Sequence, residues 1–227
     1  MSSAETKNGI PGIWLLLFAA LLGMQVVLSA NQTRLLLGLS RQISQRPSPS
    51  APDDARFSSV PTDHRPRIGR VDAPVQIVVF SDYGCSVCAT LDGDLQQLLS
   101  AYPDDVAITF RSFPPTHRAA VAARGAFCAS AQGKFLPFHR LLFENPKDWK
   151  AEEIIDSARS LGMDAAAFKA CLSSDSTRAE IDQDRMQGNR LGVKGTPTFF
   201  VNGRRVSGWI PYAETERLVR EELSSAR

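Results

Sequence analysis

The sequence predicts an α/β domain in which a helix joins two parallel strands and a hairpin extends the sheet. The first observation is the apolar run VQIVVF at residues 75–80, which is typical of a strand buried on both faces. The second is the leucine-bearing segment 86–102, followed by another apolar run at 106–110, which together predict a β-α-β unit. The third is the short apolar segment TFFV at residues 198–201, which is followed by the dipeptide Asn202-Gly203 and a return segment at 204–207.

The remaining elements follow from the same patterns. The hairpin is expected to pair residues 198–201 with 204–207 across Asn202-Gly203, a sequence that favours two-residue turns. A helix over residues 213–223 is expected to cover the sheet. Between strand and hairpin, about residues 115–191 have almost wholly helical patterning and predict an inserted helical subdomain.

An apolar segment and a polar linker precede this domain. Residues 13–30, IWLLLFAALLGMQVVLSA, would span roughly 27 Å as a helix, close to the hydrocarbon thickness of about 30 Å. They predict a transmembrane anchor or a cleaved signal segment, preceded by a cytoplasmic tail at 1–12. Residues 31–67 are rich in Pro and Ser and predict a flexible linker. The folded domain is expected to occupy residues 68–227.

Composition excludes several functions. The chain has 227 residues, 43% hydrophobic and 22% charged, with a formal net charge of +2, which are ordinary values for a globular protein. No run of like charge suggests a nucleic-acid partner. Its four cysteines are too few for a miniprotein held together by disulfides. They contain one close pair where a four-cysteine zinc site usually has two, so no metal site is expected.

The close pair, Cys85 and Cys88, stands at the start of the helix expected over residues 86–102. Unpaired backbone NH groups and the helix dipole stabilise an anion there, so Cys85 is expected to be a thiolate nucleophile. Cys88 would be the resolving thiol of an exchange that passes through a mixed disulfide and needs no cofactor. The alternative is a non-enzymatic chaperone that binds copper(I) through the same cysteines, although the flanking residues supply no further soft ligands.

A second motif is Gly195-Thr196-Pro197, which places a proline at the start of the strand over residues 198–201. The missing NH of proline costs least at that position. The residues alone leave both cis and trans forms of the Thr196-Pro197 bond open.

Four segments, FSDYGCSVCATL, RSFP, FCASAQGKF and LGVKGTPTFFVNG, together resemble DsbA-type thiol-disulfide oxidoreductases of the thioredoxin superfamily. The resemblance covers roughly residues 71–223. It implies a thioredoxin-like fold with an inserted helical subdomain, with Cys85 as attacking thiol and Cys88 as resolving thiol. It also implies that Pro197 is a cis proline and that Thr196 offers backbone groups to a bound peptide.

The resemblance further implies the partners of the protein. These would be cysteine-containing exported proteins and a membrane or periplasmic redox partner, with oxidase activity favoured over reductase activity. Isomerases of this superfamily use a dimerisation domain, for which residues 31–67 are too short and polar. Glutathione-dependent enzymes on a related fold usually lack the second cysteine, which is retained here as Cys88.

The sequence departs from the family at two places. Val79 stands where many relatives carry a buried glutamate that relays a proton to the resolving thiol, so proton transfer needs another route, with Asp82 and water as candidates. Ser86-Val87 stands where relatives place Pro, His, Gly or Tyr between the cysteines. This dipeptide brings no positive charge to the thiolate, so we expect a less extreme oxidant.

Cys128 and Cys171 admit two interpretations, buried apolar cysteines or a structural disulfide, and we favour the disulfide because export would permit it. His117 and His139 lack the spacing to other ligands or acids that a metal site or a nucleophile triad shows, so structural roles are expected for both.

The charges that flank the apolar segment conflict with export. Lys7 is the only basic residue before it, whereas Arg34, Arg41 and Arg46 follow it, which by the positive-inside rule would keep the domain in the cytoplasm. Long domains translocate largely regardless of such charges, and disulfide chemistry suits an oxidising compartment. We therefore expect a single-pass protein of the cell membrane with its domain on the periplasmic or extracytoplasmic side, or a soluble periplasmic protein after cleavage.

Overall fold

The computed structural model describes residues 16–17, 21–25, 28, 31–32, 57, 60, 62 and 64–225. The chain divides into two units, Met1–Ser48 and Pro49–Arg227. The predicted cytoplasmic tail, most of the predicted anchor or signal segment and most of the predicted linker lie outside the described residues. Within the described residues, no helix combines the length and apolar character needed to cross a membrane.

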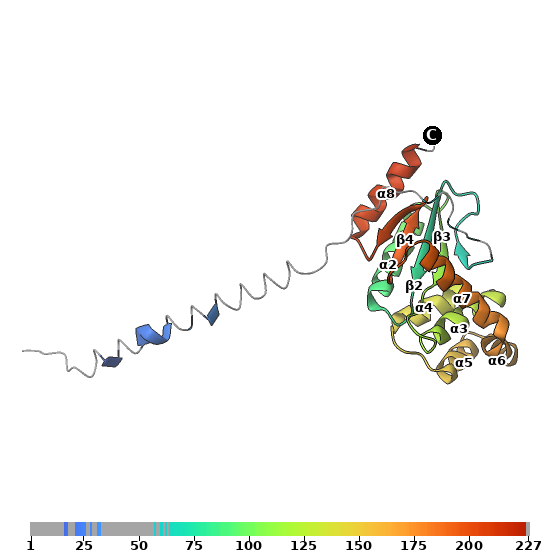
Figure 1. Cartoon of the computed structure of the whole chain (residues 1–227), viewed down its shortest axis with the longest axis horizontal. Helices are drawn as coiled ribbons and strands as arrows, with labels where there is room; N and C mark the ends of the chain where they lie inside the picture. The colour runs from blue at the N-terminus through green and yellow to red at the C-terminus, as the bar shows by residue number, and fades with distance from the viewer. Residues whose placement is uncertain are drawn as a thin grey trace, which may run out of the picture. The chain divides into compact units, whose positions relative to one another are not determined.

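The second unit is built on one mixed sheet of five strands in the order β1-β3-β2-β4-β5 (Figure 1). The parallel pair is β2 and β3, and all other neighbouring strands are antiparallel. The strands are β1 Arg67–Ile68, β2 Val75–Ser81, β3 Val106–Ser112, β4 Thr198–Val201 and β5 Arg204–Ser207. The predicted β-α-β unit and hairpin are both present. Strand β1 was not predicted.

Both faces of the central strand β2 are buried, as its unbroken apolar sequence predicts. Val75, Ile77 and Val79 face the main core, while Val78 and Phe80 belong to a second cluster on the other face. This alternation follows from the two-residue repeat of a strand. Helix α2 (Ser86–Ala101) contributes leucines to the main core, and α8 (Tyr212–Ser225) contacts β2 and β4.

The predicted helical insertion is observed as five helices between β3 and β4, of which α3 to α6 gather at one end of the sheet (Figure 1). Helix α3 is alanine-rich and packs against each of the other four. The helices are α3 Ala120–Ala131, α4 Phe135–Glu144, α5 Ala151–Ser160, α6 Ala165–Ser173 and α7 Asp175–Arg190.

Helix α7 approaches the second face of the sheet closely at Gly188. A Cβ atom placed there would lie 2.7 Å from the ring of Phe113 and 3.2 Å from that of Phe80. A side chain at this position would therefore collide with two aromatic rings. The absence of a side chain at Gly188 lets α7 cover the second face.

The turn between β4 and β5 has the predicted two-residue form. Asn202 and Gly203 both have positive φ values, 44° and 86°. Asparagine and glycine tolerate this backbone region better than other residues, which explains why the dipeptide predicts the hairpin.

The folded unit begins earlier than the boundary predicted at residue 68. Arg65 is 5% exposed and pairs through its side chain with Asp184 and Glu180 of α7, each at 2.6 Å. Phe57 packs edge-on against Phe200, with ring centroids 5.4 Å apart. The C-terminal end of the expected linker is therefore part of the fold, because a buried ion pair and an aromatic contact hold it there.

Candidate active site

The cysteine pair lies where β2 ends and α2 begins. Cys85 is the N-cap residue of α2, with an extended backbone, and its Sγ atom accepts the backbone NH of Cys88 at 3.3 Å. The backbone NH of Cys85 is bonded to the carbonyl of Asp82 at 3.1 Å, which fixes the turn. The sulfur therefore lies at the positive end of the helix dipole, as predicted from the spacing.

This environment favours the thiolate form of Cys85. The hydrogen bond from the Cys88 thiol is the largest cause that lowers the pKa of Cys85, to about 6 from an ordinary value of 9.0. The backbone NH of Cys88 and a side-chain hydrogen bond from Thr196 lower it further, against the opposing effect of burial. Cys85 is half-buried, so the sulfur remains open to a partner molecule.

Cys88 has the opposite properties. It is 1% exposed, and its pKa is raised strongly, first because its proton is held in the hydrogen bond to Cys85 and second because of burial. Both sulfurs are free thiols in this structure. The pair thus combines one accessible, acidic sulfur with one buried sulfur that keeps its proton.

The second motif lies beside the first. Strand β4 runs antiparallel to β2 with Thr198 opposite Phe80, which places the preceding loop next to Cys85. The Thr196-Pro197 peptide bond is cis, and the Thr196 carbonyl lies 3.8 Å from Cys85 Sγ. The structure therefore brings together Cys85, Cys88, Thr196 and Pro197, which the sequence analysis singled out separately.

Asp82 lies in the turn directly before Cys85. It is 8% exposed, and burial raises its pKa to about 6. The negative charges of Cys85 and Asp148 also raise the pKa, while backbone NH groups of Gly84 and Tyr83 oppose the shift. Asp82 was one of the two expected proton carriers, and it does lie near the cysteine pair.

A buried hydrogen-bonded chain behind the pair was missed by sequence reasoning. The Nε2 atom of His139 lies 2.7 Å from Oδ1 of Asp92, and its Nδ1 atom lies 2.8 Å from the hydroxyl of Tyr83. His139 is 1% exposed and Asp92 is 7% exposed. Asp92 stands one helical turn after Cys88, a spacing that could have indicated it, whereas nothing in the sequence connects His139 with α2.

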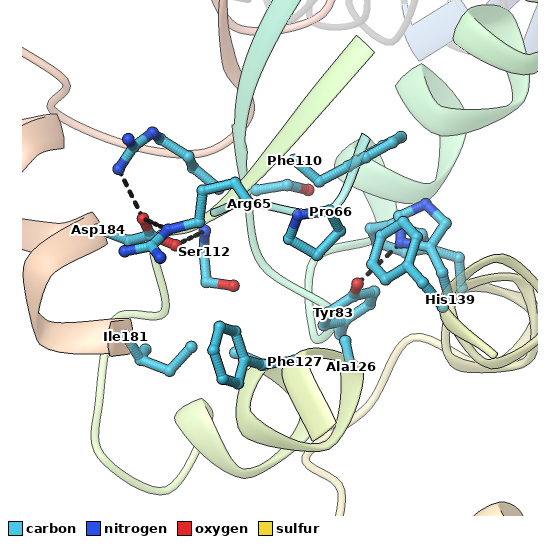
Figure 2. A pocket seen from close by; sticks show the side chains of 15 residues that line it. Arg65, Pro66, Tyr83, Phe110, Ser112, Ala126, Phe127, His139, Ile181 and Asp184 are labelled. Atoms are coloured by element: carbon cyan, nitrogen blue, oxygen red, sulfur yellow. Dashed lines mark hydrogen bonds and ion pairs between the residues drawn. The ribbon is translucent and has the colours of Figure 1, made fainter. Parts of the chain in front are cut away.

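Figure 2 shows the Tyr83 hydroxyl directed at the His139 ring, at one side of a small cavity of about 20 Å³. Arg65 and Asp184 line its other side. The ring of His139 is enclosed by those of Phe110, Phe135 and Phe143, with centroids 4.5, 4.9 and 4.9 Å away. By contrast, His117 is exposed just before α3.

The other two cysteines are bonded to each other within the helical insertion. The Sγ atoms of Cys128 in α3 and Cys171 in α6 are 1.98 Å apart, and the bond closes a sequence separation of 43 residues. Cys128 is 1% exposed. Among residues 64–225 and the other described positions, no three His, Cys, Asp or Glu side chains are grouped in a way that could hold a metal ion.

Comparison with known proteins agrees with this geometry. A thioredoxin family model matches residues 60–221. The thioredoxin-like oxidoreductase of Silicibacter pomeroyi DSS-3 is 27% identical, with a TM-score of 0.66 over 71% of this chain and 94% of that one. The thiol-disulfide exchange protein alpha-DsbA2 of Wolbachia pipientis shares the fold, with 24% identity and a TM-score of 0.64 over 69% of this chain and 86% of that one.

A curated relative is the Na(+)/H(+) antiporter NhaA of Herminiimonas arsenicoxydans, which is 32% identical over 140 residues. The match covers 62% of this chain but 22% of the antiporter, so the chain spans less than a quarter of that relative's length.

A thioredoxin fold with a helical insertion and a CxxC pair at the start of a helix defines the class of thioredoxin-like oxidoreductases. The chain belongs to the thioredoxin family, which its family model matches over most of its length.

Proposed function

We propose that this chain exchanges disulfides with cysteine-containing exported proteins, with Cys85 as nucleophile and Cys88 as resolving thiol. The observation that carries the proposal is the division of the pair into an accessible sulfur of pKa about 6 and a buried sulfur that keeps its proton. The lower-pKa thiol is the better leaving group and the more abundant thiolate at neutral pH.

In the oxidase direction, a substrate thiolate attacks Cys85 Sγ of the Cys85–Cys88 disulfide. The disulfide breaks, a substrate–Cys85 disulfide forms, and Cys88 leaves and takes up a proton. A second substrate thiolate then attacks the substrate sulfur of the mixed disulfide and releases Cys85 as a thiolate. Two electrons pass from the substrate dithiol to the cysteine pair, and a redox partner removes them. Thr196 and Pro197 adjoin Cys85 and would align the substrate peptide.

Stabilisation of the Cys85 thiolate supports the oxidase direction. Any interaction that favours the reduced pair over the disulfide makes the disulfide more oxidising. The hydrogen bonds to Cys85 are interactions of this kind. We place the domain on the extracytoplasmic side, consistent with disulfide chemistry in an oxidising compartment and with a Salmonella enterica neighbour of the same fold that is described as periplasmic.

The first test is the reduction potential of Cys85–Cys88, measured by equilibrating the protein with glutathione buffers and counting free thiols. A value above about −180 mV supports an oxidase, whereas a value near about −270 mV indicates a reductase. The absence of any redox transition would reject the exchange function and favour copper(I) binding by the same thiols.

The second test is capture of substrates. Cys88→Ser removes the resolving thiol and is expected to accumulate mixed disulfides between Cys85 and exported proteins, visible on non-reducing gels. Cys85→Ser is the matched control and should accumulate none. Equal amounts of mixed disulfide in the two variants would contradict the roles assigned to Cys85 and Cys88.

A further inference from the structure

The proposed exchange requires Cys88 to give up a proton in the interior of the protein. Cys88 attacks a mixed disulfide on Cys85 whenever the pair is reoxidised, and the attacking species is a thiolate. The thiol is 1% exposed, and its pKa is raised first by the hydrogen bond to Cys85 and second by burial. Val79, at the back of the pair on β2, is 2% exposed and carries no group that could accept the proton.

A small cavity connects Cys88 to a buried acid. The cavity measures about 10 Å³ and is lined by Cys88 and Asp92, with Val79, Ser81 and Phe110 among the other residues around it. This is roughly the smallest space that holds one water molecule. Cys88 and Asp92 therefore border the same small space, and one water molecule in it would link the thiol to the carboxylate. Asp82 does not line this cavity.

The hydrogen-bonded side chains of His139 and Tyr83 behind Asp92 explain how this acid can be buried. Neutral His139 satisfies both contacts if Nε2–H donates to Asp92 Oδ1 and Nδ1 accepts the Tyr83 hydroxyl, at 2.7 and 2.8 Å. The aromatic rings around His139 fix its plane. This hydrogen bond engages Oδ1 of Asp92 and leaves Oδ2 as the oxygen that can take a proton.

We propose that Asp92, positioned by His139 and Tyr83, accepts the proton of Cys88 when Cys88 attacks a mixed disulfide on Cys85. The inference rests on the proposed function. In this step, the Cys88 proton passes to the Asp92 carboxylate, and the resulting thiolate attacks Cys85 Sγ. The Cys85–Cys88 bond forms while the bond from Cys85 to the partner sulfur breaks, and the partner leaves as a thiolate. In the reverse step, Asp92 returns the proton to Cys88.

The titratable groups around Cys88 come from few elements. Helix α2 contributes Asp92, and Cys85 is its N-cap residue. The turn before it contributes Asp82 and Tyr83, and α4 contributes His139. Strand β3 contributes the apolar Phe110 to the cavity. Among these residues Asp82 is thus the competing carboxylate, and its variant distinguishes the two candidates.

The test uses the reduced full chain and the aromatic disulfide DTNB in a stopped-flow spectrometer. Attack by Cys85 releases a first thionitrobenzoate at a rate that depends on DTNB concentration. Attack by Cys88 on the mixed disulfide releases a second thionitrobenzoate at a rate that is independent of DTNB concentration. We expect Asp92→Asn to slow the second release by about 100-fold at pH 7, a typical loss for a missing general base. The first release should stay within about two-fold of wild type, because the Cys85 contacts remain.

Asp94→Asn is the matched control, since Asp94 is on the same helix but bonds to Trp209. This variant should leave the second release unchanged, and Asp82→Asn tests the competing carboxylate. If Asp82→Asn slows it and Asp92→Asn does not, the inference is wrong. If Asp92→Asn does not fold, His139→Gln tests the role of Asp92 instead. A slower second release with a normal first release supports the inference, and unchanged rates of both releases overturn it.

Failure of the inference is distinguishable from failure of the proposed function. If wild type releases two thionitrobenzoates and Asp92→Asn does so equally fast, the exchange function stands and the role of Asp92 is rejected. If wild type releases only the first, Cys88 is not a resolving thiol and the proposed function itself fails.

Discussion

At the scale of single residues, the charge of Cys85 depends on four hydrogen-bond contacts, from the Cys88 thiol, the Cys88 backbone NH, Thr196 and the Val87 backbone NH. Its pKa of about 6 lies below the ordinary value of 9.0, so the thiolate stabilises the folded, reduced protein. That contribution is fully present above the unfolded pKa near 9 and is lost as the pH falls through about 6.

This predicts the pH dependence of alkylation. The rate at which iodoacetamide modifies Cys85 should rise through a midpoint near pH 6, because only the thiolate reacts. Cys88→Ala removes the side-chain donor to Cys85, and the midpoint should move to higher pH. A midpoint near the ordinary value of 9.0 in the wild-type protein would show that these contacts do not stabilise the anion.

The sequence predicted Cys85 and Cys88 because their chemistry depends on local spacing, which a single helix start determines. For Thr196 and Pro197, the residues alone left both forms of the peptide bond open, and the expected roles came from the family resemblance. The Asp92–His139 contact could not be predicted in this way, since its partners are 47 residues apart and meet only when α4 packs on α2. The expectation of a structural role for His139 rested on the lack of a nearby ligand in sequence, which says nothing about neighbours in space.

At the scale of elements, the bond between Cys128 and Cys171 ties α3 to α6 across a 43-residue separation. A cross-link of this span restricts the unfolded chain, which the chain-entropy model values at about 4 kcal/mol. The double variant Cys128→Ala/Cys171→Ala should lose about that much free energy of unfolding, measured in urea. Its cysteine pair at the active site should keep the wild-type reduction potential. An unchanged unfolding free energy would mean that the bond contributes no stability.

Two glycines in helices should respond oppositely to substitution. Gly188→Ala forces a methyl group against Phe113 and should destabilise the protein by about 1–3 kcal/mol. Gly93 in α2 is exposed, with no atom near its absent Cβ, so Gly93→Ala should stabilise it by about 0.5–1 kcal/mol. Thermal unfolding of both variants measures the difference. Destabilisation of equal size in both would indicate a backbone effect and not a packing effect.

Strands and helices were predicted where apolar periodicity extends over several residues, as in β2, α2 and the helices of the insertion. Strand β1 was missed because its two residues, Arg67 and Ile68, are too short to show a period. Their pairing with Thr109 and Ile108 is fixed by the neighbouring strand and not by local preference.

At the scale of the whole molecule, a buried ion cluster joins three distant parts of the chain. Asp184 on α7 accepts Arg65 of the N-terminal segment at 2.6 Å and Arg111 of β3 at 2.7 Å, and all three side chains are at most 5% exposed. Sequence could not predict this cluster, because each member alone resembles a surface charge.

Asp184→Ala should therefore destabilise the protein by about 3–5 kcal/mol, since it leaves two buried guanidinium groups without this carboxylate. Asp156→Ala, which breaks a pair exposed by 63% and 69%, should change stability by less than about 1 kcal/mol. Urea denaturation compares the two. Similarly small changes in the free energy of unfolding for both variants would show that solvent already reaches the cluster around Asp184.

The contrast between the two cysteine pairs gives the protein a graded response to reductant. The active-site pair contains Cys85, whose low pKa makes it a good leaving thiol, whereas Cys128 is enclosed in the insertion and Cys171 is half-buried. A mild reductant acting on the native protein should open Cys85–Cys88 long before it reaches the second bond. Repeated catalytic cycles can thus leave the Cys128–Cys171 bond intact. After treatment with a mild reductant, two free thiols in native buffer and four in denaturant would show that the two disulfides differ in this way.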